Sequence, residues 1–417
     1  MLIDGIGEAE EEHAGCAPAS PFHLAEALAT WPDDAVILLR ATGNEGWRTV
    51  AGSRRVIEVR CDEESYEDRV GCWRDAARRD AIDVSEGELR TLAGRFRLTG
   101  GQVRRAFALA RDLAVLAGDG EGPTTSRLAQ AARMGSDQTL GKLASKVECK
   151  HGWDDLVLPA LTLHRLRDLA AAIQHRFMVY DEWGFGARVT AGSGIRALFA
   201  GGSGTGKTMA AGVIARELGL DLYRVDLSGV VSKYIGETEK NLDRIFNAAR
   251  TANAVLFLDE AESLVGKRSE VKDSHDRYSN IEVAYLLQKL EDHDGIVVLA
   301  TNLKQHMDAA FHRRLQYMID FPRPDSAERE RIWRGMFPRR APVSADVDFR
   351  FLAKEFDLTG GEIRNVVLDA AFLAAGDGGV IGMRAIVEAL ARQLAKEGKT
   401  PTGVEFRQYQ GLVAGRE

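Results

Sequence analysis

The stretch "RALFAGGSGTGKTMAAGVIARELG", from Arg196 to Gly219, puts a burst of glycines between an apolar run and a helical pattern. Within it, residues 201–208 fit the pattern G-x-x-x-x-G-K-[ST]. Glycines let the backbone close around a phosphate group, and the amides of the loop and the start of the next helix attract an anion. The predicted phosphate-binding residues are Gly201, Gly202, Ser203, Gly204, Thr205, Gly206, Lys207 and Thr208. Lys207 supplies a charge for the β- and γ-phosphates, and the Thr208 hydroxyl suits Mg²⁺.

Two further strand ends carry polar residues that fit the same chemistry. The segment "AVLFLDEAE" spans Ala254 to Glu262, and its apolar run ends in adjacent carboxylates. In a parallel sheet a buried strand opens at its carboxyl end into the ligand crevice, so Asp259 is expected to hold Mg²⁺ and Glu260 to act as general base toward water. "DGIVVLATN" ends at Asn302, which is placed to orient that water. A solvated acidic turn is the alternative interpretation of "DEAE", and the phosphate loop before it favours the catalytic one.

The composition of the chain bounds the class of protein. Its 417 residues suffice for two or three domains, and 45% apolar and 28% charged residues are ordinary for a globular protein. A formal charge of −7 argues against a broad basic surface for DNA or RNA. The four cysteines form no CxxC pair, no apolar run approaches about 20 residues, and the acidic start lacks a signal core. We therefore expect reduced thiols, a cytoplasmic location and no membrane partner.

Taken in chain order, the motifs resemble those of the AAA ATPase family. The phosphate loop, "LFLDEAE", "VVLATN", "FHRRL" and "FPRPD" follow one another as they do in that family, over roughly residues 152–394. The resemblance implies that Lys207 and Thr208 are the Walker A pair. Asp259 and Glu260 match the Walker B pair, and Asn302 matches the residue called sensor 1. ATP and Mg²⁺ are therefore the expected ligands.

The same resemblance implies contacts beyond a single subunit. Arg313 and Arg314 match the arginine-finger region, which completes the site of a neighbouring subunit in a ring that is usually hexameric. "VVSKYIGETEKNLDRIF" is similar to the pore-loop segment of the family, and Lys233, Tyr234 and Ile235 match the residues that hold a substrate polypeptide. An aromatic ring packs on an extended backbone with little sequence preference. A half-buried aromatic is the alternative interpretation of Tyr234, and its flanking lysine and glycine favour an exposed loop.

The segment "LTGGEIRNVVLDAAFLA" resembles the start of the helical lid of the family. Gly360 and Gly361 fit the close contact that AAA proteins make near adenine. Arg364 stands where clamp-loader-like relatives carry a sensor 2 arginine, whereas the remodelling branch often lacks it. We expect Arg364 to contact phosphate, with an ordinary surface position on the helix as the alternative.

The tetrapeptide "LTGG" also occurs earlier in the chain, at Leu98, which is 260 positions before Leu358. At the same offset Arg104 aligns with Arg364, and the dipeptide "WR" at position 73 aligns with "WR" at position 333. We interpret this pattern as a duplicated module, in which residues 24 to about 115 are the back end of an earlier copy. That copy lacks the phosphate loop and the carboxylate pair, and is predicted to be inactive. Its exposed edge strand needs a cover, either the acidic N-terminal arm or a neighbouring subunit.

These observations predict an α/β fold: the parallel sheet of a P-loop NTPase with a C-terminal helical lid, preceded by a partial, degenerate copy of the same module. The predicted parts are a flexible N-terminus (1–23), the partial first module (24–117), a linker (118–150), the AAA large subdomain (151–325), the lid (326–397) and a C-terminal tail (398–417).

The leading functional hypothesis is an ATP-hydrolysing AAA protein that remodels, unfolds or disassembles a protein substrate through an oligomeric ring of its own copies. The alternative is an ATP-dependent assembly factor or switch that does not thread its client. The segment "GWDDLVLP" before the module resembles two-module bacterial AAA ATPases that are encoded beside phage-tail-like contractile injection systems. A nucleic-acid motor or clamp-loader relative is a third hypothesis, favoured only by Arg364 and opposed by the acidic charge balance.

Overall fold

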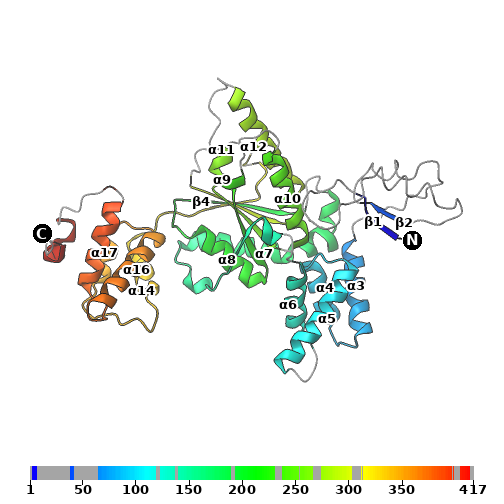
Figure 1. Ribbon diagram of the computed structural model, residues 1–417, viewed down its shortest axis with the longest axis horizontal. Coiled ribbons are helices and arrows are strands. Elements are labelled where there is room, and N and C mark those ends of the chain that lie inside the picture. Colours follow the sequence, from blue (N-terminus) through cyan, green and yellow to red (C-terminus); the bar gives the residue numbers. More distant parts are fainter. Residues whose placement is uncertain are drawn as a thin grey trace. The chain divides into compact units, whose positions relative to one another are not determined.

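The computed structural model of the protein divides into two compact units, Met1–Glu63 and Glu64–Glu417. It describes residues 2–6, 38–41, 64–118, 123–136, 140–188, 193–230, 237–252, 254–265, 274–302, 311, 313–396, 398 and 404–413. In the first unit β1 (Leu2–Ile6) pairs in parallel with β2 (Leu38–Ala41) (Figure 1). Of residues 1–23, which are expected from the sequence to be flexible, the structure describes Leu2–Ile6, which form β1. Pairing with β2 satisfies backbone N–H and C=O groups that a lone edge strand leaves open.

The second unit begins with four helices that we call the first bundle (Figure 1). They are α3 (Tyr66–Arg79), α4 (Glu86–Arg95), α5 (Gly100–Ala117) and α6 (Thr125–Ser136). Ser65, Ser85 and Thr99 cap the first three helices, each accepting a hydrogen bond from the backbone N–H three residues later. The largest buried side chains of the bundle are Trp73, Leu92, Phe96, Leu98 and Phe107. The bundle therefore has a hydrophobic core of its own.

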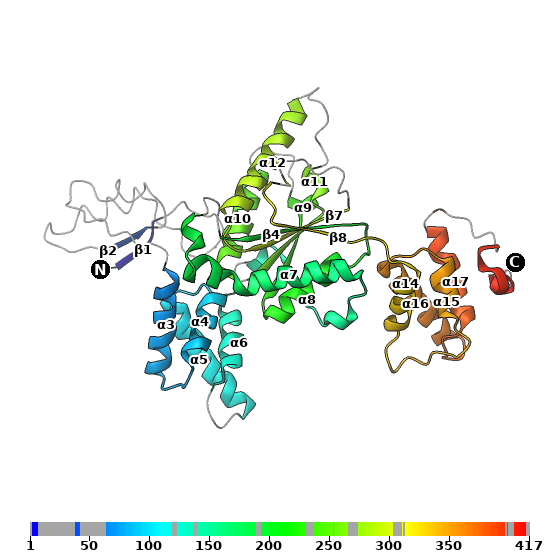
Figure 2. The same ribbon diagram turned by 180° about the vertical axis from the view of Figure 1, so that it is seen from behind.

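A six-stranded sheet follows, in the spatial order β3-β5-β6-β7-β4-β8. Figure 2 labels three of its strands, β4, β7 and β8. Its strands are β3 (Ser145–Val147), β4 (Ile195–Ala200), β5 (Asp221–Asp226), β6 (Ala254–Asp259), β7 (Ile296–Thr301) and β8 (Tyr317–Asp320). Neighbouring strands run parallel, except that β3 is antiparallel to β5. Short parallel strands of this kind need helical crossovers, and those helices bury the sheet.

Helices cover both faces of this sheet. On one face α7 (Ala160–Phe177) and α8 (Lys207–Leu218) share a core with the strands. On the other face α10 (Glu237–Ala252) and α12 (Ser274–Asp292) contribute to a second core. The shorter segments are η1 (Leu140–Lys142), η2 (Trp153–Asp155), the π-helix η3 (Met178–Glu182), η4 (Phe185–Arg188), α9 (Leu227–Val230) and α11 (Glu262–Val265). A largely parallel sheet between two helical layers confirms the predicted α/β class.

Four more helices form what we call the second bundle. They are α14 (Ser326–Met336), α15 (Phe349–Glu355), α16 (Gly360–Gly376) and α17 (Met383–Lys396) (Figure 2). The tail continues as η6 (Val404–Tyr409) and α18 (Gln410–Val413), and its Phe406 is fully buried against Phe356 of this bundle. Within the part of the chain that the structure describes, no helix is long and apolar enough to cross a membrane.

The sequence offset of 260 residues also relates contacts inside the two bundles. In the first, the buried Arg69 donates from Nε to the carbonyl of Ala93 (3.4 Å) and from Nη1 to the carbonyl of Glu64 (2.8 Å). In the second, the buried Arg329 donates from Nε to the carbonyl of Ala353 (2.8 Å) and from Nη1 to the carbonyl of Pro324 (2.6 Å). These acceptors lie 260 positions after Ala93 and Glu64. Buried aligned pairs are Trp73 and Trp333, Phe96 and Phe356, Leu98 and Leu358, and Ala110 and Ala370. The two bundles therefore share an internal design as well as a motif.

Candidate nucleotide site

The glycine-rich loop joins the carboxyl end of β4 to the first residue of α8. Gly204 (φ 75°) and Gly206 (φ 101°) adopt the left-handed backbone conformation, which side chains oppose and glycine tolerates. A methyl group at Gly201 would strike the carbonyl oxygen of Phe321, and one at Gly204 would meet the Thr359 hydroxyl at 2.7 Å. The loop is thus a tight backbone cradle at a helix N-terminus, which fits a phosphate group.

Lys207 is buried at the centre of this site. Its Nζ donates to two carbonyl oxygens at the start of the loop, at 2.6 and 2.9 Å, and to Asn302 Oδ1 at 2.8 Å. Burial lowers the pKa of this ammonium, and the carboxylates of Asp259 and Glu262 act in the opposite direction. The structure thus brings Lys207, the first residue of α8, into contact with Asn302, which follows β7.

Glu262, the first residue of α11, fixes the orientation of Asn302. The Nδ2 of Asn302 donates to Glu262 Oε1 (2.8 Å), and the backbone N–H of Asn302 donates to Oε2 (3.2 Å). The amide oxygen is thereby turned toward Lys207. Sequence analysis did not single out Glu262, although it is the last residue of the quoted "DEAE"; only the structure shows that it reaches β7.

Asp259 ends β6, and both of its carboxylate oxygens have partners. Oδ1 accepts from the backbone N–H of Glu260 at 3.0 Å, and Oδ2 lies 2.8 Å from Nη2 of Arg224 on β5. Glu260 is exposed and has a positive φ of 55°, which is unusual for a residue with a side chain. Arg224 is a second residue that the sequence analysis missed; a charged residue between Tyr223 and Val225 in the middle of the strand "DLYRVD" was the available signal.

The second bundle meets the phosphate loop directly. The backbone N–H of Gly361 donates to the carbonyl of Gly204 (3.0 Å), and a methyl group at Gly361 would lie 2.9 Å from Gly204 Cα. Thr359 caps α16, so this contact is made by the first turn of that helix. Gly360 and Gly361 are therefore packed on the loop backbone itself. Arg364 is exposed and makes no hydrogen bond or ion pair to the residues that the structure describes.

The two candidate finger arginines differ in their surroundings. Arg314 is half-buried, and its Nε lies 2.6 Å from Oε1 of Glu291, a residue of α12. Arg313 is exposed and has no hydrogen bond or ion pair within the described part of the chain. The predicted pore-loop residues Lys233, Tyr234 and Ile235 lie outside the described residues.

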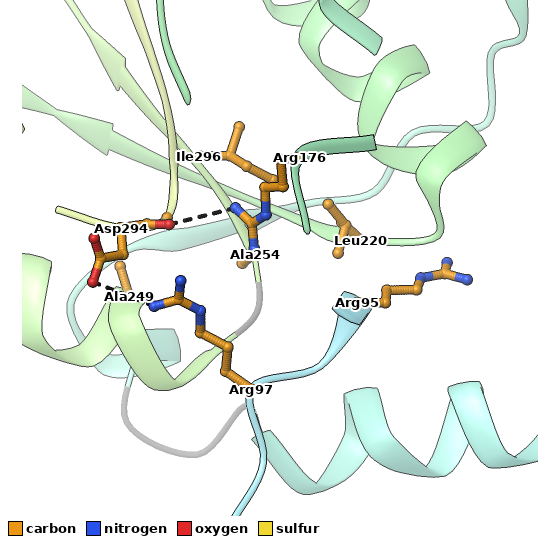
Figure 3. A pocket seen from close by; sticks show the side chains of 9 residues that line it. Arg95, Arg97, Arg176, Leu220, Ala249, Ala254, Asp294 and Ile296 are labelled. Atoms are coloured by element: carbon orange, nitrogen blue, oxygen red, sulfur yellow. Dashed lines mark hydrogen bonds and ion pairs between the residues drawn. The ribbon is translucent and has the colours of Figure 1, made fainter. Parts of the chain in front are cut away.

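A second polar cluster, which we call the rear junction, lies at the amino ends of β4 and β7. Asp294 Oδ2 receives Arg97 Nη1 at 3.3 Å, Oδ1 accepts from the N–H of Ser193 at 3.1 Å, and the Asp294 carbonyl accepts from Arg176 Nη1 at 3.5 Å. Figure 3 shows Arg97 and Arg176 directed toward Asp294, whereas Arg95 points away from it. Burial lowers the pKa of Arg176 to about 9. The first bundle is thus tied to the end of the sheet opposite the phosphate loop.

Arg95 contacts the far end of the same helix that begins at Lys207. Its guanidinium lies against Gly219, the left-handed residue that ends α8 (φ 58°), where any side chain would overlap it. A cation at a helix C-terminus is favourable, because the carbonyl groups there carry negative partial charge. Burial and the nearby Arg133 both lower the pKa of Arg95. Arg95 thus contacts the end of α8, and the rear junction contacts the start of β7. The other ends of these two elements carry Lys207 and Asn302.

Comparison with known proteins agrees with this geometry. Residues 197–323 match the family profile described as "ATPase family associated with various cellular activities (AAA)". The chain carries an AAA ATPase domain. Residues 65–138, the first bundle, match a second profile, "Contractile injection system ATPase helical domain". The AAA domain thus follows a helical domain that has a family of its own.

The relatives of the AAA domain are ATPases of several kinds. An "Uncharacterized AAA family ATPase y4kL" of Sinorhizobium fredii is 31% identical over 48% of this chain and 58% of that protein. "Katanin p60 ATPase-containing subunit A1" of Strongylocentrotus purpuratus is 32% identical over 42% of this chain and 36% of that protein. "Proteasome-activating nucleotidase" of Aeropyrum pernix is 32% identical over 51% of this chain and 54% of that protein. The chain thus spans about half the length of the curated relatives it matches, or less.

Proposed function

We propose that the AAA domain binds ATP with Mg²⁺ and hydrolyses it. The observation that carries this proposal is the hydrogen bond from Lys207 to Asn302, beside a loop in which Gly204 and Gly206 adopt the left-handed conformation. Asp259 and Glu260 lie at the carboxyl end of β6, the strand next to β7. Polar groups at adjacent carboxyl ends of parallel strands are where ligands of this fold bind. The names of the relatives, which include ATPases and a nucleotidase, support the same chemistry.

The residues have distinct proposed roles in this reaction. The loop amides and Lys207 hold the β- and γ-phosphates. Phosphate oxygens can replace the three oxygens that now accept hydrogen bonds from Lys207 Nζ, namely two loop carbonyls and Asn302 Oδ1. Thr208 and Asp259 would hold Mg²⁺, which neutralises phosphate charge when bound. Glu260 takes a proton from the attacking water as general base, and Asn302 orients that water. The Glu260→Gln variant is expected to bind ATP and lose hydrolysis.

We further propose that a neighbouring copy completes the site through Arg313. Arg314 is paired with Glu291 of its own subunit, whereas the exposed Arg313 has no such partner among the described residues. An arginine donated in trans stabilises negative charge that develops on the transferred phosphoryl group. The geometry therefore favours Arg313 over Arg314 as the finger, in an oligomeric ring of the usual AAA kind.

The test is ATP hydrolysis per subunit measured against protein concentration with Mg²⁺ present. A rate that rises steeply with concentration supports a site shared between subunits, and a rate that stays constant down to dilute monomer contradicts it. A mixing experiment sharpens the result. Arg313→Ala subunits have an intact phosphate loop, and Lys207→Ala subunits have an intact finger, so the mixture is expected to regain hydrolysis that neither variant shows alone. Arg314→Ala subunits should hydrolyse ATP without being mixed with another variant.

We propose protein remodelling as the work that this hydrolysis drives. The sequence around Lys233, Tyr234 and Ile235 supports it, as do relatives named "ATP-dependent zinc metalloprotease FtsH 3" and "Proteasome-activating nucleotidase". A fluorescent protein with an unstructured peptide tail serves as the substrate probe. Tyr234→Ala is expected to retain ATP hydrolysis and lose unfolding of the probe, while Tyr234→Phe keeps both, since the ring supplies the contact. Unfolding that persists in Tyr234→Ala would contradict threading.

A second candidate function is an ATP-dependent assembly factor or switch for a contractile injection system. The match of residues 65–138 to the helical domain of such ATPases favours it. The two candidates differ in their need for hydrolysis. A switch captures its partner with ATP bound alone, so Glu260→Gln should retain partner capture in full. A remodeller with the same substitution should hold its substrate without releasing it in an altered form.

A further inference from the structure

Arg224 lies inside β5, on the sheet face that α8 covers. Its register partner on β6 is Phe257, and Phe257 packs in the same core as the first turns of α8. The next aligned pair on that face is Asp226 and Asp259, because side chains two residues apart share a face of a strand. Arg224 therefore reaches along the sheet toward the carboxyl end of β6, where its Nη2 lies 2.8 Å from Asp259 Oδ2.

The two partners of this ion pair differ in exposure. The Asp259 side chain is 16% exposed, whereas that of Arg224 is 44% exposed. The other oxygen of Asp259 accepts from the Glu260 N–H, so the carboxylate has a partner on each side. The guanidinium can turn out to water without displacing β5, but the carboxylate stays at the strand end. We therefore expect the ion pair to break by movement of the Arg224 side chain and not of Asp259.

We propose that Arg224 is a positioning residue that holds the Asp259 carboxylate and competes with Mg²⁺ for it, and so sets the Mg²⁺ concentration that the site requires. The inference rests on the proposed function, in which Asp259 is a metal ligand. A guanidinium beside this carboxylate occupies one of its oxygens and places a like charge close to the cation position. Removal of the charge should therefore make the site more sensitive to Mg²⁺.

The same strand offers a matched ion pair for comparison. Lys146 of β3 lies 2.9 Å from Asp221 at the amino end of β5, with exposed fractions of 44% and 19%. These values are close to those of the Arg224 pair, but Asp221 is five residues from the carboxyl end of β5. Loss of either residue removes one ion pair of β5, and loss of Lys146 also removes its contact with the Tyr223 ring. Of the two, Arg224 is the one that contacts the proposed Mg²⁺ ligand.

The experiment measures binding of methylanthraniloyl-ADP to the full chain while Mg²⁺ is added to protein treated with EDTA. Arg224→Ser is expected to lower the Mg²⁺ midpoint about two- to five-fold, the factor that corresponds to a partly exposed ion pair. Arg224→Lys keeps the charge and should keep the wild-type midpoint. Lys146→Ser should also keep it. The affinity for the nucleotide in EDTA is expected to be equal in all four proteins.

An Arg224→Ser midpoint equal to or above that of wild type would overturn the inference. An equal shift in Lys146→Ser would overturn it as well, because the effect would then come from the sheet and not from Asp259. Weaker nucleotide binding of Arg224→Ser in EDTA would have the same consequence. Wild-type protein that binds no ADP at any Mg²⁺ concentration would instead remove the proposed function, a result distinct from the other three.

Discussion

The first and second bundles share their internal contacts but differ in what the start of their third helix touches. In the second, Gly361 at the start of α16 donates to Gly204 of the phosphate loop. In the first, the N–H of Gly100 at the start of α5 donates at 3.3 Å to Oε1 of Glu64, a residue just before α3. The first turn of α5 thus contacts a side chain of its own bundle, whereas the first turn of α16 contacts the phosphate loop.

One aligned position carries opposite charges in the two bundles. Asp357 of the second bundle lies 2.8 Å from the buried Arg329 and pairs with it inside the bundle. The residue 260 positions earlier is Arg97, and its positive charge repels that of Arg69. Arg97 reaches out of the bundle to Asp294 at the rear junction. A reversal of charge at one position thus replaces an internal partner by a contact with the sheet.

Removal of the shared buried arginine should have the largest effect on stability. Arg329→Ala leaves two carbonyls without donors and Asp357 with one partner fewer, and we expect a loss of about 3 kcal/mol, since each buried group left unpaired costs about 1–3 kcal/mol. Arg69→Ala should cost about 2 kcal/mol, because no described carboxylate forms an ion pair with Arg69. Urea unfolding measures both losses. The aligned Arg74→Ala and Arg334→Ala are the controls, because these side chains are 33% and 58% exposed, and they should change stability by less than about 0.5 kcal/mol. Equal effects of buried and exposed arginines would contradict the shared design.

Charge reversal at the rear junction should have the next largest effect. Arg97→Asp puts two carboxylates together at Asp294 and is expected to cost about 2 kcal/mol, from a lost ion pair and a new repulsion. Hydrogen exchange should rise in α4 and α5 while α16 stays protected. The double variant Arg97→Asp with Asp294→Arg restores opposite charges and should recover at least half of the loss. Failure of the double variant to recover any stability would show that packing, and not charge, holds the first bundle to the sheet.

The contact between the second bundle and the phosphate loop allows a comparison of aligned glycines. A methyl group at Gly361 would lie 2.9 Å from Gly204 Cα, whereas one at Gly101 has its nearest neighbour at 3.8 Å, in the flexible side chain of Arg104. Gly361→Ala is therefore expected to weaken ADP binding about ten-fold, which corresponds to about 1.4 kcal/mol. Gly101→Ala should leave it unchanged. Wild-type affinity in Gly361→Ala would mean that the loop does not depend on this close approach.

The phosphate loop, the polar strand ends and the repeated helix cap could be predicted from the sequence. The glycine spacing before Lys207 and the apolar runs before Asp259 and Asn302 led to the loop and the strand ends, and the α/β class and the AAA resemblance are confirmed. The repeated "LTGG" led to two helices with the same threonine cap. These features succeed because each is encoded by neighbouring residues in the chain.

The residues that the sequence analysis missed depend on register and tertiary packing. Arg224 meets Asp259 because β5 and β6 pair so that Arg224 lies opposite Phe257, which no single strand reveals. Glu262 acts on Asn302 forty residues away, and Asp294 meets Arg97 across a still larger separation. The assigned roles of the site residues and the domain boundaries stay predictions, as do those of the pore-loop residues beyond the described chain.

The smallest expected effect concerns the aligned arginines Arg364 and Arg104, which are both exposed near the start of their helices. Arg364 stands on the helix that contacts Gly204, so a phosphate contact from this position requires only a change in the side chain or a small shift of the second bundle. Arg364→Ala is then expected to raise the KM for ATP about three-fold, in keeping with a solvent-exposed charge contact. Arg104→Ala should leave the KM unchanged, because the first turn of its helix contacts Glu64 and not the phosphate loop. An unchanged KM in both variants would leave Arg364 as a surface residue, and the two bundles would then differ at the phosphate loop through Gly361 alone.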